Sequence, residues 1–177
     1  MTTPSIKISE SDALLHRASC LAARLHQNQV RKDGATPYFS HLQRVALHLS
    51  HRFGCEDPVV LAAGLLHDAI EDTTADFDEI AETVDNKVAD LVAALTKDMR
   101  LPEDEREADY DRQLAAAPWQ ARLIKLADVY DNVTDSVLSS ACVDVRKKAQ
   151  RALLLAGEEP ELAVAARALR NLLPEPS

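Results

Sequence analysis

The chain has 177 residues, of which 46 % are hydrophobic and 28 % charged, and its formal net charge is −9. This length is enough for one domain with its own hydrophobic core. The acidic balance argues against a general binder of nucleic acid or anionic membrane, so we expect neither as a partner. A phosphorylated small molecule is still compatible with it, provided that a metal or a local basic pocket holds the phosphate.

The cysteines and the apolar segments indicate a compartment. Cys20, Cys55 and Cys142 are scattered without the spacing of a metal site, and their odd number argues against a closed disulfide framework. The first ten residues contain no apolar signal region, and no apolar run approaches the length of a membrane span. We therefore expect a protein of the reducing cytoplasm.

The first two predicted helices flank a loop that contains glycine and proline. The first helix covers about 10–28, with Ser9 as its cap and Asp12 at the third helical position. The segment "VRKDGATPY" then breaks the helical pattern. The second helix begins near Ser40, keeps its apolar residues at helical spacing and ends at Gly54.

The third predicted helix begins at Asp57, a capping residue, followed by Pro58 at the first helical position. Its segment "VVLAAGLL" is apolar on every face, which predicts a central helix. It runs directly into "HDAIED" (residues 67–72), where four ionisable groups follow a buried segment. Buried charge is costly unless it is paired or bound to a metal, so this cluster needs a specific explanation.

The rest of the chain also predicts helices, with no internal repeat and no interdomain linker. They cover about 76–84 and 87–97, start near 102 and 118, and then cover about 141–155 and 159–172. The acidic run "PEDEREADYD" (102–111) is interpreted as a solvated face. The fold class is therefore an all-α bundle, with 1–177 as a single domain.

Polar residues at helical spacing point to a lined cleft. On a continuing helix, residues four apart share a face, which would place His67 with Glu71 and Asp68 with Asp72. In "KLADVYDN" (125–132), a polar stripe lies between apolar neighbours at spacings of three and four. Three residues form this stripe: Lys125, Asp128 and Asn132.

The remaining histidines have a simpler interpretation. Four of them are expected at helix surfaces or at the edge of the core: His16, His26, His48 and His51. We expect Arg44, three residues after His41, to pair with an acidic neighbour.

These segments resemble a known family. His41, then His67-Asp68, then Asp128 resemble the H…HD…D pattern of the HD-domain metal-dependent phosphohydrolases. The stretches "RKDGATPYFSH", "HDAIEDT", "LTK" and "KLADVYDN" are similar to blocks of the hydrolase domain of the Rel/Spo alarmone enzymes and of their small single-domain relatives. The resemblance covers roughly residues 12–135 in consistent order and implies a helical HD-type bundle.

The resemblance also implies a role for each matching position. The metal ligands would be His41, His67, Asp68 and Asp128, around one divalent ion that is typically Mn²⁺ but chemically compatible with another transition metal. Glu71 and Asp72 would orient or deprotonate the attacking water. Four residues would bind substrate: Arg31 and Lys32 the nucleotide, Lys97 a distal phosphate, and Asn132 the ribose or the water. The family reaction removes the 3′-pyrophosphate of (p)ppGpp to give GDP or GTP and pyrophosphate.

Two alternatives stay open at this point. The chain ends soon after its last predicted helix, and no residue matches the aromatic side chain that closes the nucleotide pocket in longer relatives. A different substrate, such as NADPH, a deoxynucleotide or another phosphoester, is therefore the second hypothesis. The third is a nucleotide sensor that keeps the fold and the metal without catalysis. The sequence predicts neither the oligomeric state nor which metal is bound in the cell.

Overall fold

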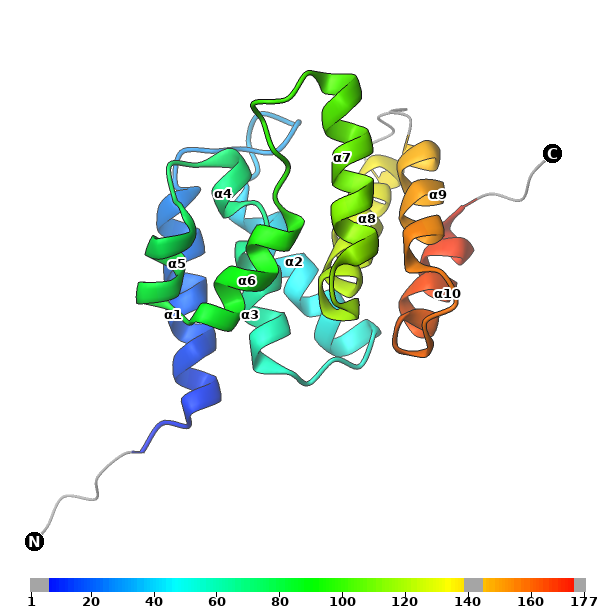
Figure 1. The fold of residues 1–177 in the computed structure, drawn as a ribbon. Coiled ribbons are helices and arrows are strands. Elements are labelled where there is room, and N and C mark those ends of the chain that lie inside the picture. The colour runs from blue at the N-terminus through cyan, green and yellow to red at the C-terminus, as the bar shows by residue number, and fades with distance from the viewer. Residues whose placement is uncertain (1–6, 139–144, 174–177) are drawn as a thin grey trace, which may run out of the picture.

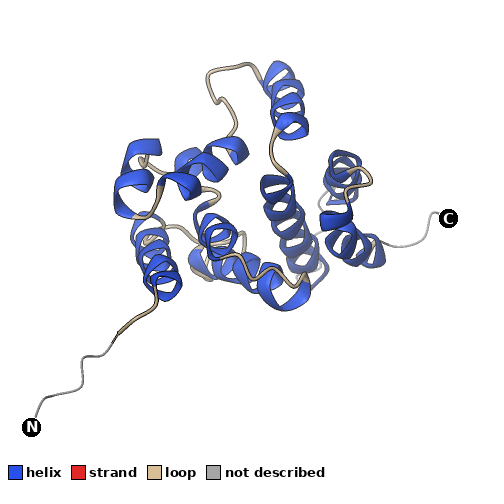
Figure 2. Cartoon of the chain, turned by 60° about the horizontal axis from the view of Figure 1, so that its bottom comes forward, coloured by secondary structure: helices blue, strands red, loops and turns tan. Residues whose placement is uncertain are grey.

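The computed structural model describes residues 7–138 and 145–173, and within these ranges the regular secondary structure is helical (Figure 2). The elements are α1 (Glu10–Leu25), α2 (Phe39–Leu47), the π-helix η1 (His48–Arg52), α3 (Pro58–Leu66), α4 (Ala69–Asp72), α5 (Phe77–Thr83), α6 (Asn86–Leu95), α7 (Glu103–Ala116), α8 (Trp119–Leu138), α9 (Val145–Ala156), the 3₁₀-helix η2 (Pro160–Leu162) and α10 (Ala163–Leu172). This confirms the all-α prediction.

Local capping chemistry sets several of the helix starts. The side chains of Ser9, Asp57 and Asp76 each accept a hydrogen bond from a backbone N–H in the first turn of the helix that follows. Gly54 has a φ of +72° directly after η1, a conformation that glycine adopts without strain. Residues 141–144 of the predicted eighth helix lie outside the described residues, and α9 is described from Val145.

The helical pattern breaks at a functionally important place. α3 ends at Leu66, His67 and Asp68 lie in a turn, and α4 begins at Ala69. The prediction that His67 shares a face with Glu71 applies to a continuing helix, and the helix is interrupted here. Both residues of the HD pair lie at the end of the central helix.

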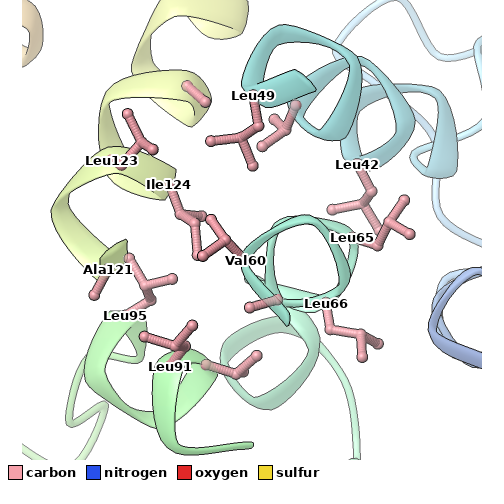
Figure 3. Packing of buried hydrophobic residues seen from close by; sticks show 14 of the residues in the cluster. Leu42, Leu49, Val60, Leu65, Leu66, Leu91, Leu95, Ala121, Leu123 and Ile124 are labelled. Atoms are coloured by element: carbon pink, nitrogen blue, oxygen red, sulfur yellow. The ribbon is translucent and has the colours of Figure 1, made fainter. Parts of the chain in front are cut away.

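The core surrounds α3 (Figure 3). Val60 and Leu66 of α3 are fully buried, with Leu42 of α2 on one side and Ile124 of α8 on another. α3 itself is apolar all round, as the sequence predicts for a central helix.

Gly64 of α3 allows a close approach between helices. A Cβ atom at this position would lie 2.6 Å from Cδ1 of Leu49, which is fully buried in η1. A larger residue at this position would force the end of the Leu49 side chain to shift, so glycine suits the close packing of α3 against η1.

The helices that form the functional region stand together in Figure 1. α7, α8 and α9 contact one another, and α8 also contacts α2, α3 and α6. α1 packs on α3 on the side away from α9. A search of the described helices finds none that is both long enough and apolar enough to cross a membrane.

Candidate metal centre and substrate cavity

Three helices bring two histidines and an aspartate to one point. His41 lies in the first turn of α2, His67 follows the last residue of α3, and Asp128 lies in the middle of α8. One ligand atom of each lies within 4.8 Å of those of the other two. His41 Nε2 is 3.3 Å, and His67 Nε2 is 3.7 Å, from Asp128 Oδ1. All three side chains are buried, so the cluster is part of the interior rather than a surface group.

Asp68 lies beside this cluster. Its Oδ2 is 3.1 Å from His67 Nε2 and 3.8 Å from His41 Nε2. The same oxygen accepts a 2.7 Å hydrogen bond from the hydroxyl of Tyr38. The four residues with the HD-type pattern are therefore neighbours in space, although they come from distant parts of the chain.

The hydrogen bonds of the two histidines show which nitrogen faces the cluster. His67 Nδ1 is 2.9 Å from the carbonyl oxygen of Gly64, which can only accept, so Nδ1 carries the hydrogen. His67 Nε2 is buried without a hydrogen-bond partner among the described residues. His41 Nδ1 is 2.7 Å from Asp131, which leaves its Nε2 for the cluster. Two imidazole nitrogens with two carboxylates fit a divalent transition metal, and the buried Nε2 of His67, without a hydrogen-bond partner among the described residues, fits a metal ligand.

The electrostatics of the cluster favour added positive charge. Burial alone would lower the pKa of His41, but hydrogen bonds to Asp128 and Asp131 raise it above its usual value. Burial would likewise lower the pKa of His67, but the charges of Asp68 and Asp128 and the hydrogen bonds to them together raise it above its usual value. Burial works against ionisation of Asp128, yet the neighbouring Lys125 and the histidines hold its pKa low. Carboxylates that stay ionised beside histidines attract either protons or a divalent ion.

Two further carboxylates border the cluster. Glu71 is half-buried and accepts a 3.2 Å hydrogen bond from the backbone N–H of Lys97. Burial raises the pKa of Glu71 above its usual value. Burial and the charge of Asp68 likewise raise the pKa of Asp72, whose carboxylate lies 3.4 Å from the hydroxyl of Tyr38. Raised pKa values suit groups that accept a proton near neutral pH.

Arg31 and Asn132 lie next to the cluster, and their role in substrate binding stays a prediction. Asn132 donates to Asp128 Oδ1 at 2.6 Å and accepts from Arg31 at 2.9 Å. The Arg31 guanidinium also pairs with Asp135 and lies over the ring of Tyr38 at 5.5 Å. Lys32, in contrast, is exposed on the loop before α2.

A cavity of about 440 Å³ adjoins the cluster between α7, α8 and α9. Asp128 and Asn132 form part of its wall, so the cavity reaches the metal-ligand candidates. Five cationic side chains line it: Lys97, Arg106, Lys125, Lys148 and Arg151. The volume lies within the usual range for small-molecule sites. Three carboxylates share the lining, Glu103, Glu107 and Asp128, so cations outnumber them by five to three and the lining suits an anionic ligand.

Comparisons with known proteins agree with this geometry. The model of the HD domain matches residues 18–152. The chain belongs to the HD-domain family. Human guanosine-3′,5′-bis(diphosphate) 3′-pyrophosphohydrolase MESH1 is 42 % identical over 128 residues, which cover 72 % of this chain and 71 % of the human protein. An Aquifex aeolicus enzyme named guanosine-3′,5′-bis(diphosphate) 3′-pyrophosphohydrolase is 37 % identical over 122 residues, but these cover only 17 % of its length.

A solved structure extends the likeness to nearly the whole chain. It is described as a metazoan ortholog of SpoT that hydrolyzes ppGpp. It superposes with a TM-score of 0.80 at 29 % identity and covers 97 % of this chain and 96 % of its own. The helical HD-domain fold described here is therefore shared with that protein.

The acidic run of this HD-domain protein is more than a solvated face. Tyr110 of α7 is only 4 % exposed and lines the cavity, with Lys97 Nζ 5.3 Å and Lys125 Nζ 5.6 Å from its ring centre. Tyr110 therefore supplies an aromatic wall to the cavity. The sequence pattern did not identify an aromatic residue for this pocket. Glu107 binds Lys97 at 2.7 Å and also pairs with Arg151 of α9. The interpretation of 102–111 as wholly solvated is therefore wrong on this side of α7.

His26 is placed differently from its prediction, whereas His48 lies at the edge of the core as predicted. His26 is only 1 % exposed and stacks on Tyr38, with ring centres 5.1 Å apart. His48 lies 3.3 Å from Asp131, a buried residue of α8. Arg44 pairs with Asp131, as an ion pair was predicted for it. The sequence offered one signal for Asp131, which follows Asp128 by three positions and so shares its side of the HD-domain helix α8.

Proposed function

We propose that the chain is a metal-dependent hydrolase that removes the 3′-pyrophosphate of (p)ppGpp, giving GDP or GTP and pyrophosphate. One observation carries this proposal: the buried cluster of His41, His67 and Asp128 adjoins a cavity lined by cations. The human relative named for this reaction is 42 % identical over the aligned residues, and the solved structure described as hydrolyzing ppGpp shares the fold at 29 % identity. A phosphate ester in the cavity would place one phosphorus at the metal centre and its remaining phosphates among the cationic side chains.

We propose one divalent ion, Mn²⁺ in the first instance, held by four ligands. These are His41, His67, Asp68 and Asp128, with the histidines binding through Nε2. A bound divalent ion supplies Lewis-acid stabilisation of phosphate charge and makes water easier to deprotonate. Imidazole with carboxylate is a donor set that Mn²⁺ and neighbouring transition metals accept.

Glu71 and Asp72 are proposed to handle the attacking water. Each stands beside the cluster, and burial raises the pKa of each carboxyl, which brings its basicity closer to neutral pH. Glu71 is fixed by the backbone N–H of Lys97, so its free oxygen is held in place as a proton acceptor. Tyr38 donates to Asp68 and lies near Asp72, which orients both carboxylates.

The substrate is proposed to lie between the loop before α2 and the cavity. Arg31 and Lys32 would contact the nucleotide, Lys97 a distal phosphate, and Asn132 the ribose or the water. Arg31 already lies over Tyr38, an arrangement that suits stacking of a guanidinium on a planar group. Tyr110 provides a second aromatic surface inside the cavity.

A second substrate class fits the same walls. A cavity with several cations and one aromatic ring could hold NADPH or a deoxynucleotide by the same chemistry as (p)ppGpp.

We also expect the protein to work in the cytoplasm, because the two described cysteines, Cys20 and Cys55, are unpaired.

A product-resolved assay tests the proposal. The protein is stripped of metal, reloaded with Mn²⁺ and offered ppGpp, NADPH and a panel of deoxynucleotides separately, with Asp68→Ala as the control. We expect GDP and pyrophosphate from ppGpp with the wild type and neither product with the variant. Intact ppGpp beside cleavage of another substrate would reject the alarmone and keep the metal chemistry. Stoichiometric nucleotide binding without any product, at full Mn²⁺ occupancy, would identify a sensor instead.

A further inference from the structure

A buried carboxylate on α8 holds one of the metal-facing histidines. Asp131 is 1 % exposed and lies on the far side of His41 from the cluster. Its Oδ2 is 2.7 Å from His41 Nδ1. Asp128 Oδ1 lies 3.3 Å from the other ring nitrogen, Nε2. The imidazole of His41 therefore lies between two carboxylates of the same helix.

Asp131 is also held by a cation on α2. Arg44 donates to both of its oxygens, through Nε at 2.7 Å and through Nη2 at 2.8 Å. His48, the first residue of η1, lies 3.3 Å from Oδ1. Burial opposes ionisation, but the hydrogen bonds from His41, His48 and Arg44 hold the pKa of Asp131 far below its usual value. An ionised carboxylate only accepts hydrogen bonds, so His41 must present Nδ1–H to it.

The two histidines of the cluster are therefore fixed by different means. His67 Nδ1 faces a backbone carbonyl, that of Gly64, which no side-chain substitution removes. His41 Nδ1 faces the side chain of Asp131. A histidine that binds a metal through one nitrogen commonly donates the other N–H to a carboxylate, which fixes its tautomer and raises its basicity.

We propose that Asp131 is a positioning residue that fixes His41 with Nε2 directed at the divalent ion, with Arg44 holding the carboxylate in place through two hydrogen bonds. This inference rests on the metal centre of the proposed function but on no particular substrate. It assigns a role to a residue outside the H…HD…D pattern. It also explains why Arg44 and His48 converge on a buried acid that contacts no ligand.

The test compares Mn²⁺ dissociation constants, measured by calorimetry on metal-stripped protein. Asp131→Asn keeps the size of the side chain but removes the charge, and we expect its Mn²⁺ binding to weaken about 10- to 100-fold. Asp135→Asn is the matched control, because Asp135 also lies on α8 near Arg44, at 3.7 Å, but is part-exposed. We expect the control to bind Mn²⁺ within about twofold of the wild type. A folded Asp131→Asn protein with wild-type affinity would overturn the inference.

A measurement on the wild type does not depend on how the variant folds. In Zn²⁺-loaded, ¹⁵N-histidine-labelled protein, we expect His41 to show Nε2 as the metal-bound nitrogen and Nδ1 as the protonated one. A His41 bound through Nδ1 would overturn the inference. Failure of the proposed function looks different, because it would leave ppGpp uncleaved while Mn²⁺ binding still depends on Asp131.

Discussion

Asp128 uses its two oxygens for different purposes. Oδ1 faces His41 Nε2 at 3.3 Å and accepts from Asn132 at 2.6 Å, whereas Oδ2 accepts from Lys125 at 2.8 Å. One oxygen is therefore available to an ion and the other anchors a cation that lines the cavity. This arrangement places Lys125 at the boundary between the metal centre and the phosphate-binding walls.

Glu71→Gln separates catalysis from metal binding. Glu71 borders the cluster without being one of the proposed ligands, so the variant should keep wild-type Mn²⁺ occupancy. Loss of a general base commonly costs 10²- to 10⁴-fold, and we expect kcat to fall by roughly that factor. Steady-state kinetics with metal analysis of the same samples measures both quantities. Glu82→Gln, at an exposed position of α5, is the control and should keep its rate. A Glu71→Gln enzyme with wild-type kcat would reject the assigned role.

The pH dependence of the rate should report the protonation of Glu71. Glu71 must be deprotonated to accept a proton, and burial raises its pKa above the ordinary 4.5. The rate should therefore be full at neutral pH and fall on acidification, with a midpoint above 4.5 rather than below it. Initial rates at saturating Mn²⁺, with occupancy checked at each pH, give the midpoint. The residual activity of Glu71→Gln should lack this limb, and an unchanged limb in the variant would assign the titration to another group.

At the scale of elements, α3 links the core to the metal centre. Its apolar residues pack against α2, α6 and α8, and its last turn leads into His67 (Figure 3). Gly64 sits at the closest approach, since a Cβ atom there would meet Leu49 at 2.6 Å. The position of α3 is thus fixed by a steric fit in addition to apolar burial.

Gly64→Ala should destabilise the protein although alanine is the better helix former. Overpacking of a core typically costs about 1–3 kcal/mol, against a gain of about 1 kcal/mol in helix propensity. We expect a net loss of about 1 kcal/mol in the free energy of unfolding, measured by urea denaturation. Leu49→Val removes the opposing methyl group, and in that background Gly64→Ala should be neutral or stabilising. Equal effects in both backgrounds would show that the contact with Leu49 is not the cause.

At the scale of the whole molecule, the acidic chain concentrates positive charge in one place. Its net charge is −9, yet five cationic side chains line the cavity. The proposed ligands come from three separate segments of the chain, namely α2, the turn after α3, and α8. An unfolded chain does not hold these groups together, so a divalent ion should bind the folded state selectively.

Mn²⁺ should therefore raise the melting temperature. At a free concentration one hundred times the dissociation constant, selective binding adds about 2.7 kcal/mol. For a chain of this length that corresponds to an increase of about 5–10 °C. Scanning calorimetry with and without a chelator measures the shift. Asp128→Asn should lose most of it, and an equal shift in that variant would place the stabilising ion elsewhere.

Much of the fold could be predicted because its signals are local. The caps at Ser9 and Asp57 and the glycine after η1 act through their own backbone neighbours. The convergence of His41 with His67 was predicted from a sequence pattern, and the structure brings these side chains together. The roles of the ligands stay predictions until the metal is measured.

The differences arise where distant segments meet. His26 is buried because Tyr38, beyond the following loop, stacks on it. Tyr110 is buried because a wall of its cavity comes from α9, which the acidic composition of α7 does not reveal. The break after Leu66 also escapes a periodicity argument, since the apolar spacing continues into Ala69 and Ile70. Each of these features depends on tertiary packing rather than on local propensity.

The carbonyl of Gly64 has a consequence for how this protein can vary. The same residue that admits Leu49 against α3 also accepts the hydrogen bond from His67 Nδ1. A displacement of α3 that relieves crowding in the core would therefore rotate a metal-facing imidazole. A change at this position of α3 should therefore alter thermal stability and metal affinity at the same time. A lineage that repacks the interior behind Gly64 must retune its metal centre in the same steps.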